Sequence, residues 1–262
     1  MAADKNWGEA PEVQAKPLQR HEIAMRYLAR NPDFQADYVK ALEDVRRGSF
    51  TIDDATSRLI RIWGLSYPAD PDAPHDMSRI HVQPVLSPVT VQLTASDISS
   101  PSDTCFTSDK LKQMHHCLQC DGLSHVILAD EAGDIRLCLT PDCEYPLALH
   151  LPLDSNLHIR LASAERLRRH ILGLAAGPPP LLLTSLQQSH LLIMLRAWDG
   201  RMDGIRAREL ATMLIDPDVD AYSAALWSDS RQRRQIGRWL SDAESLISGG
   251  YLRLLRGDDR RR

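Results

Sequence analysis

Apolar residues recur every three or four positions through the first quarter of the chain, which is the spacing of one helix face. The pattern predicts three helices, over residues 18–30, 33–45 and 49–65. Pro32 separates the first two because proline cannot continue a helix, and Thr51 can cap the third by accepting a backbone N–H. The chain therefore starts with a helical unit.

From Val89 onward the spacing of the apolar residues changes from that of a helix to that of a strand. Val89, Val91 and Leu93 alternate with polar residues, as in a strand with one buried face. Short apolar runs separated by turn residues continue this pattern, and a small antiparallel sheet is the simplest account of them. The runs span residues 125–128, 135–139, 147–151 and 157–161.

Helical spacing returns after the last of these runs. Ser163 can cap a helix over residues 164–174, which Gly177 and three prolines follow. Two further helices are predicted over residues 186–198 and 206–214. Together with the three helices at the start, they indicate an α+β chain that is mostly α, with a small antiparallel sheet at its centre.

The last predicted helix, residues 228–248, has two unlike faces. Arg231, Arg234 and Arg238 fall on one side, with Arg233 at its edge, and apolar residues fall nearly opposite. A helix buried on one face and lined with arginine on the other is shaped to meet an anion. The apolar stripe consists of Ile236, Trp239, Leu240, Ala243, Leu246 and Ile247.

Charge is unevenly distributed along the chain. The whole sequence of 262 residues has a formal net charge of −4. Residues 1–157 carry 14 Lys and Arg against 23 Asp and Glu, whereas residues 158–262 carry 17 against 12. The basic excess lies with the arginine helix, which suggests an acidic body joined to a module for a polyanion, with DNA as the leading candidate.

Three stretches near the start, YLARNPDFQADYVKAL, WGLSYPADPDAP and QPVLSPVTVQLT, resemble the N-terminal domain of a family of bacterial transcriptional-regulator-like proteins. The C-terminal stretch, which ends in GGYLRLL, resembles the DNA-binding domain that accompanies it. The relatives are the RovC-type activator of type VI secretion and the excision-activating regulators of integrative and conjugative elements. The resemblance covers residues 18–93 and 155–256. It implies a sequence-specific DNA-binding transcriptional regulator, and more specifically an activator.

We expect an N-terminal regulator-like domain at residues 18–93, a β-rich or loop segment at 94–154 and a DNA-binding domain at 155–262. The DNA-binding module should be like a helix-turn-helix, but the acidic connection at residues 216–225 is longer than the usual turn. Basic and apolar residues alternate over 251–256, which predicts a terminal strand, either a wing on DNA or an edge strand on the core.

Several side chains around the arginine helix have the chemistry to contact DNA. Arginine can read guanine with two hydrogen bonds, glutamine can read adenine, and serine with the N–H groups of a helix N-terminus can hold a phosphate. The alternative is a solvated face on which Arg238 pairs with Asp242. The predicted DNA contacts are Arg206, Arg208, Ser228, Ser230, Arg231, Arg233, Arg234, Gln235, Arg238 and Arg253.

The cysteines allow a second kind of site. Cys117 and Cys120 form one close pair, and Cys138 and Cys143 form a looser one, which approximates the spacing of a zinc ribbon. Because the second pair brackets a proline and two of the thiols fit apolar strand positions, we favour thiols without a metal. No cofactor is expected.

Enzymatic signals are weak. The sequence has no phosphate-cradling glycine loop, no HExxH and no GxSxG. The polar first twenty residues and the odd number of cysteines indicate a cytoplasmic protein. A single short helix contacts few base pairs, so we expect a homo-oligomer. No small-molecule pocket is evident, which leaves control by abundance or by a protein regulator. The competing function is an antiactivator that sequesters another regulator without binding DNA.

Overall fold

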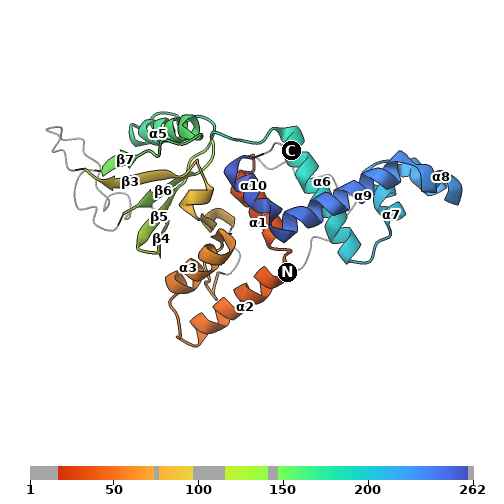
Figure 1. Cartoon of the computed structure of the whole chain (residues 1–262), viewed down its shortest axis with the longest axis horizontal. Helices are drawn as coiled ribbons and strands as arrows, with labels where there is room; N and C mark the ends of the chain where they lie inside the picture. The colour runs from red at the N-terminus through yellow and green to blue at the C-terminus, as the bar shows by residue number, and fades with distance from the viewer. Residues whose placement is uncertain (1–16, 74–76, 97–115, 141–146, 259–262) are drawn as a thin grey trace.

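The computed structural model describes residues 17–73, 77–96, 116–140 and 147–258. In Figure 1 a β-sheet with one covering helix lies at one end of an elongated molecule, and a group of helices from the C-terminal third lies at the other. The N-terminal helices lie between the two ends. The fold is α+β and mostly α, as the sequence indicates.

The three N-terminal helices form where the apolar spacing predicts them. They are α1 (Arg20–Leu28), α2 (Pro32–Arg46) and α3 (Ile52–Trp63). The Asn31 side chain caps α2 by accepting from the backbone N–H groups of two residues in its first turn, and Thr51 caps α3 in the same way. Gly64 then ends α3 in the left-handed region, at φ 79°.

The central sheet has five strands in the order β4-β5-β6-β3-β7. All its neighbouring pairs are antiparallel except β3 with β6, which run parallel, so the predicted antiparallel sheet is mixed at one position. A two-stranded ribbon, β1 (Leu65–Ser66) with β2 (His81–Val82), follows α3, together with short turns η1 (Met77–Arg79) and η2 (Pro84–Leu86). The five strands are β3 (Val91–Ala95), β4 (His116–Cys120), β5 (Leu123–Leu128), β6 (Ile135–Leu139) and β7 (Leu147–His150).

Each face of the sheet meets a different helix. One face packs against α5 (Leu157–Ile171), whose Leu167 and Ile171 lie on the apolar side chains of the strands. On the other face Leu118 and Cys120 pack against Ile60 of α3. The prediction of a strand over residues 157–161 is therefore wrong, and Ser163 lies inside α5 instead of capping it. The burial of residues 159, 163, 164 and 167 shows that helical spacing decides this segment.

The C-terminal third is helical throughout. Its elements are α6 (Ser185–Met202), α7 (Ala207–Leu214), η3 (Pro217–Ala221), α8 (Ala224–Asp229), α9 (Arg231–Ser245), the π-turn η4 (Leu246–Gly250) and α10 (Tyr251–Arg256). The terminal strand predicted over 251–256 is wrong. Tyr251, Leu254 and Leu255 are the buried residues of this segment, and their spacing of three and four belongs to a helix.

The largest hydrophobic core runs through both the N-terminal and the C-terminal helices. Asn31 donates a side-chain hydrogen bond to the Ile247 carbonyl at 3.1 Å, and the Tyr251 hydroxyl donates to the Trp63 carbonyl at 2.8 Å. The η4 turn, which follows α9, and the start of α10 are therefore bonded to the N-terminal unit. The boundaries at 93/94 and 154/155 stay a prediction. None of the helices in the described ranges is long and apolar enough to cross a membrane.

Candidate nucleic-acid interface

The start of α9 is fixed by Ser230. Its hydroxyl accepts the backbone N–H of Arg233 at 3.1 Å and donates to the Trp227 carbonyl at 2.9 Å, and the residue is only 8% exposed. One predicted DNA contact thus has a structural task, because it caps the helix and joins it to α8.

The outer face of α9 carries positive charge that the described part of the chain does not neutralise. On the inner face Ile236 and Ala243 are fully buried. On the outer face Arg231, Arg234 and Arg238 are exposed, and no hydrogen bond or ion pair joins them to the rest of the described chain. We call these three residues the arginine row. The expected alternative, in which Arg238 pairs with Asp242, is not what the structure shows.

Gly237 lies on the same exposed side of α9. A Cβ added at this position would meet nothing within 4 Å, so packing inside the chain does not require a glycine here. Glycine in a helix interior costs about 1 kcal/mol relative to alanine. A bare backbone beside the arginine row therefore leaves room for another molecule to approach closely.

The connection between α7 and α9 is held by side chains from both helices. The guanidinium group of Arg208 donates to the carbonyls of Val219 at 3.3 Å and Asp220 at 2.9 Å, and also to that of Tyr222. Gln232, in the first turn of α9, donates to an oxygen of Asp216 at 3.0 Å. Arg208, predicted as a DNA contact, is thus occupied in ordering this connection.

The remaining predicted contacts fall into four cases. Arg206 pairs with Glu209 across the start of α7, and its hydrogen bonds lower the pKa of that carboxyl. Arg233 donates to the Ser228 carbonyl and hydroxyl, at 2.9 and 3.1 Å. Gln235 is half-buried. Arg253 is exposed on α10, beyond the C-terminal end of α9, and so does not join the arginine row.

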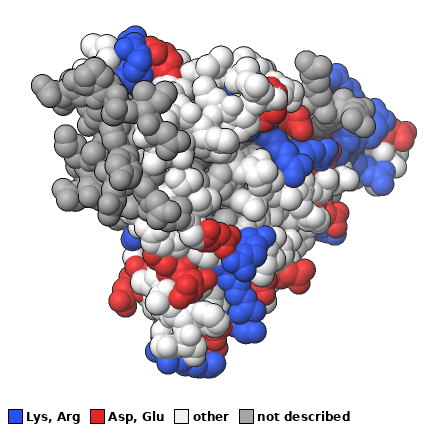
Figure 2. Space-filling view, turned by 60° about the vertical axis from the view of Figure 1, so that its left-hand side comes forward, with Lys and Arg blue, Asp and Glu red and all other residues white. Residues whose placement is uncertain are grey.

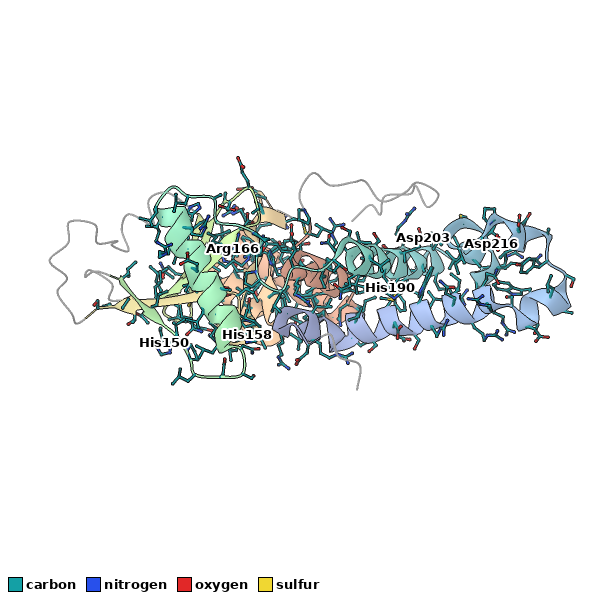
Figure 3. All side chains as sticks on the ribbon, turned by 90° about the horizontal axis from the view of Figure 1, so that it is seen from above. His150, His158, Arg166, His190, Asp203 and Asp216 are labelled. Carbon is teal, nitrogen blue, oxygen red and sulfur yellow. The ribbon has the colours of Figure 1, made fainter. Side chains whose placement is uncertain are left out.

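Figure 3 shows α9 running along α6, with side chains that project from its outer side away from the rest of the protein. Asp216 is at the outer end of this unit, beside α7 and α8. Figure 2 shows Lys and Arg gathered on the side of the C-terminal helices, whereas acidic and basic side chains alternate over the lower part of the view.

Residues 150–256 match the family model described as "T6SS, Transcription factor, DNA binding domain". Residues 7–68 match the proteobacterial transcriptional regulator-like domain. The chain is a transcriptional regulator with a DNA-binding domain of the RovC type. The first match contains α5 to α10 and with them the arginine row, so the outer face of α9 belongs to a DNA-binding domain. A search of the curated proteins finds no match to the chain.

The cysteines of this regulator are not arranged as a zinc ribbon in the part of the chain that is described. Cys117 and Cys120 lie on opposite faces of β4, since the first is exposed and the second is buried. Cys138 is buried on β6, where burial raises the pKa of its thiol to about 11, and Cys143 lies outside the described residues. No group of three metal-binding side chains occurs among the residues described.

Sequence reasoning missed two features of the DNA-binding domain. It treated the connection before α9 as a loop, although a short helix, α8, occupies residues 224–229. The cap signal was present, because Ser223 accepts the N–H of Leu226. It also missed that Arg208 is a structural residue, because the three carbonyls it meets come from a segment whose path the sequence does not reveal.

Proposed function

We propose that this regulator binds double-stranded DNA sequence-specifically through the outer face of α9 and activates transcription. The observation that carries the proposal is the arginine row: three exposed guanidinium groups without a partner in the described chain, on a helix whose opposite face buries Ile236, Trp239 and Ala243. In helix-turn-helix proteins the N-terminal part of the second helix reaches base edges. Arg231 and Arg234 occupy that part of α9.

The rest of the domain supports this placement. Gly237 leaves space beside the arginine row for a sugar–phosphate backbone. Ser228 and Arg233 lie at the helix start, where hydroxyl and guanidinium groups can hold phosphates. Arg208 orders the connection, so that the helix is presented in one orientation. By the resemblance stated above, the regulated genes belong to type VI secretion or to a mobile element, and the protein works in the cytoplasm.

We also infer self-association. One 15-residue helix contacts few base pairs, and symmetric oligomers usually read two half-sites. Light scattering should therefore give more than one copy per particle at micromolar concentration, with and without DNA. A monomer under both conditions would overturn this part of the proposal.

The decisive experiment replaces the arginine row with alanine. Arg231→Ala, Arg234→Ala and Arg238→Ala together should weaken binding to a promoter fragment by about 100-fold or more at ~100 mM salt, because each contact to DNA contributes about 1–3 kcal/mol. Fluorescence anisotropy with labelled DNA measures the affinity. The thermal midpoint should not move, since exposed side chains without partners contribute little to folding.

A matched control removes the same charge elsewhere. Arg47, Arg61 and Arg168 are exposed arginines, each paired with a nearby carboxylate. Their triple alanine variant should bind DNA as the unaltered protein does. Equal losses in both variants would mean that only net charge matters. Promoter regulation that survives without any DNA binding would instead support the antiactivator function.

A further inference from the structure

A cavity of about 580 Å³ lies on the face of the sheet that α5 does not cover. Its floor is one row of side chains across neighbouring strands, because His125 pairs in register with Cys138, Cys138 with Gln92, and Gln92 with His150. Ile60 of α3 and the η2 turn form part of the opposite wall. The volume falls in the range of small-molecule sites, although no such pocket is evident from the sequence.

Arg160 is one of the residues that line this cavity, and one of its donors has no acceptor among the described residues. The residue is 8% exposed, and its Nε and Nη2 atoms are bonded to the Asp154 carboxylate, Nη2 at 2.7 Å. Its Nη1 atom is buried and has no hydrogen-bond partner in the described chain. A buried donor without an acceptor is costly, so an oxygen atom from a bound molecule would satisfy it.

The charged side chains that line the cavity are already paired within the protein. Asp154 neutralises Arg160, and Asp121 at the rim pairs with Arg61. Burial lowers the pKa of His125 to about 4, so the imidazole on the floor is uncharged at neutral pH. An anionic ligand would bring a negative charge next to two carboxylates that are already paired. A neutral carbonyl oxygen meets the free donor without that penalty.

The other lining side chains define the body of the ligand. Aliphatic groups face the cavity, and no Phe, Tyr or Trp is among its described lining residues. We propose that this cavity binds a small uncharged acyl compound, with its carbonyl oxygen on Arg160 Nη1 and its aliphatic body against the strands. The aliphatic lining consists of Ile60, Pro84, Val85, Leu123 and Pro152.

The site joins three parts of the molecule. Ile60 belongs to α3, the floor belongs to the sheet, and Arg160 belongs to the first turn of α5. Residues 69–149, which neither family model covers, supply most of the lining. The site thus lies outside the arginine row, and its occupancy can be tested without DNA.

Octanamide is the probe, and octanoate of the same chain length is its charged counterpart. Titration into the full-length protein, labelled at Ile and Leu methyl groups for NMR, should shift the methyl resonances of Ile60 and Leu123. We expect a Kd on the order of 0.1–1 mM for octanamide, the range for ten non-hydrogen atoms, and at least about 10-fold weaker binding of octanoate.

Two substitutions locate the site. Arg160→Lys keeps a cation for Asp154 but removes the second terminal nitrogen, and should weaken octanamide about 10-fold, while Arg168→Lys on the exposed side of α5 should change nothing. Thr94→Phe fills the cavity and should abolish binding with the thermal midpoint kept. The proposal is overturned if octanamide shifts no cavity methyl at millimolar concentration. It is equally overturned if Arg160→Lys binds octanamide unchanged, or if octanoate binds more tightly.

Discussion

Two helices of this protein have the same length and the same number of arginines but use them differently. Both α5 and α9 have 15 residues and four arginines. On α5 every guanidinium group has a partner: Arg160 binds Asp154, Arg166 binds the Gly133 and Gly177 carbonyls, Arg168 binds Glu165 and Arg169 binds the Ala175 carbonyl. On α9 only Arg233 has one, at Ser228, within the described residues.

If α9 is the DNA-binding helix, as we propose, the difference shows what marks a surface for a polyanion. Arginine content is equal in the two helices, so content alone cannot separate a structural helix from a binding helix. What separates them is how many donors the folded chain has already used. On α5 the donors satisfy carbonyls and carboxylates of nearby loops, whereas on α9 they point outward unused. A row of unused donors gains partners only from another molecule.

The largest effect should come from a buried arginine of α5. Arg166→Leu removes donors to two carbonyls, at 2.9 and 2.7 Å, and should lower the free energy of unfolding by roughly 3 kcal/mol. Arg234→Leu on α9 should change it by less than about 0.5 kcal/mol. Urea denaturation of the two variants measures both values. Equal decreases in the free energy of unfolding of the two variants would contradict the difference that we describe between the two helices.

The sheet end should also be the acid-sensitive end. Burial lowers the pKa of His125 from an ordinary 6.5 to about 4, so below pH 6.5 the unfolded chain takes up a proton that the folded chain refuses. The contribution of His125 to the free energy of unfolding is fully present above pH 6.5. It is lost as the pH falls toward 4, by roughly 2 kcal/mol between pH 7 and 4.5. His125→Gln should remove this part of the pH dependence. Unfolding profiles that coincide for both proteins would contradict the prediction.

Salt titration sharpens the role of single arginines. If the bound protein neutralises about four to six phosphates, the plot of log affinity against log salt should have a slope near −4 to −5. Arg234→Gln should make that slope shallower by about 1 and weaken binding roughly 10-fold at ~100 mM salt. Arg168→Gln on α5 serves as the control and should leave the slope unchanged.

The smallest expected change is a gain in stability. Gly237→Ala places a methyl group in open space on an exposed helix face and should raise the free energy of unfolding by up to about 1 kcal/mol. DNA affinity should fall in the same variant if a phosphate backbone lies against this position. Thermal unfolding and anisotropy together give both numbers. A variant that is more stable and binds DNA equally well would place the duplex elsewhere on α9.

Long amphipathic helices were predictable from the sequence, and short apolar runs were not. The N-terminal helices and α9 have enough turns for the period to be clear, and their caps at Asn31, Thr51 and Ser230 use ordinary chemistry. The segments 157–161 and 251–256 are too short to tell a period of 2 from one of 3.6. In both, packing against partners distant in sequence decides for the helix.

For a related reason, only part of the candidate site could be predicted from the sequence. The arginine row follows from spacing within one helix, so its common face could be predicted. Whether each donor is already used depends on distant carbonyls and carboxylates, as Arg208 shows. The cavity beside Arg160 was unpredictable because its floor needs the register of four strands, one pair of them parallel.

The hydrogen bonds from Asn31 and Tyr251 have a geometric consequence for how this protein could work on a promoter. They join η4 and α10, the elements that follow α9, to the N-terminal helices, so the C-terminal end of α9 is anchored to the N-terminal unit. With α9 seated in a groove, the bulk of the protein would leave the duplex at one fixed azimuth. Moving the operator by half a helical turn would then carry that bulk to the opposite side of the double helix, away from whatever it has to touch.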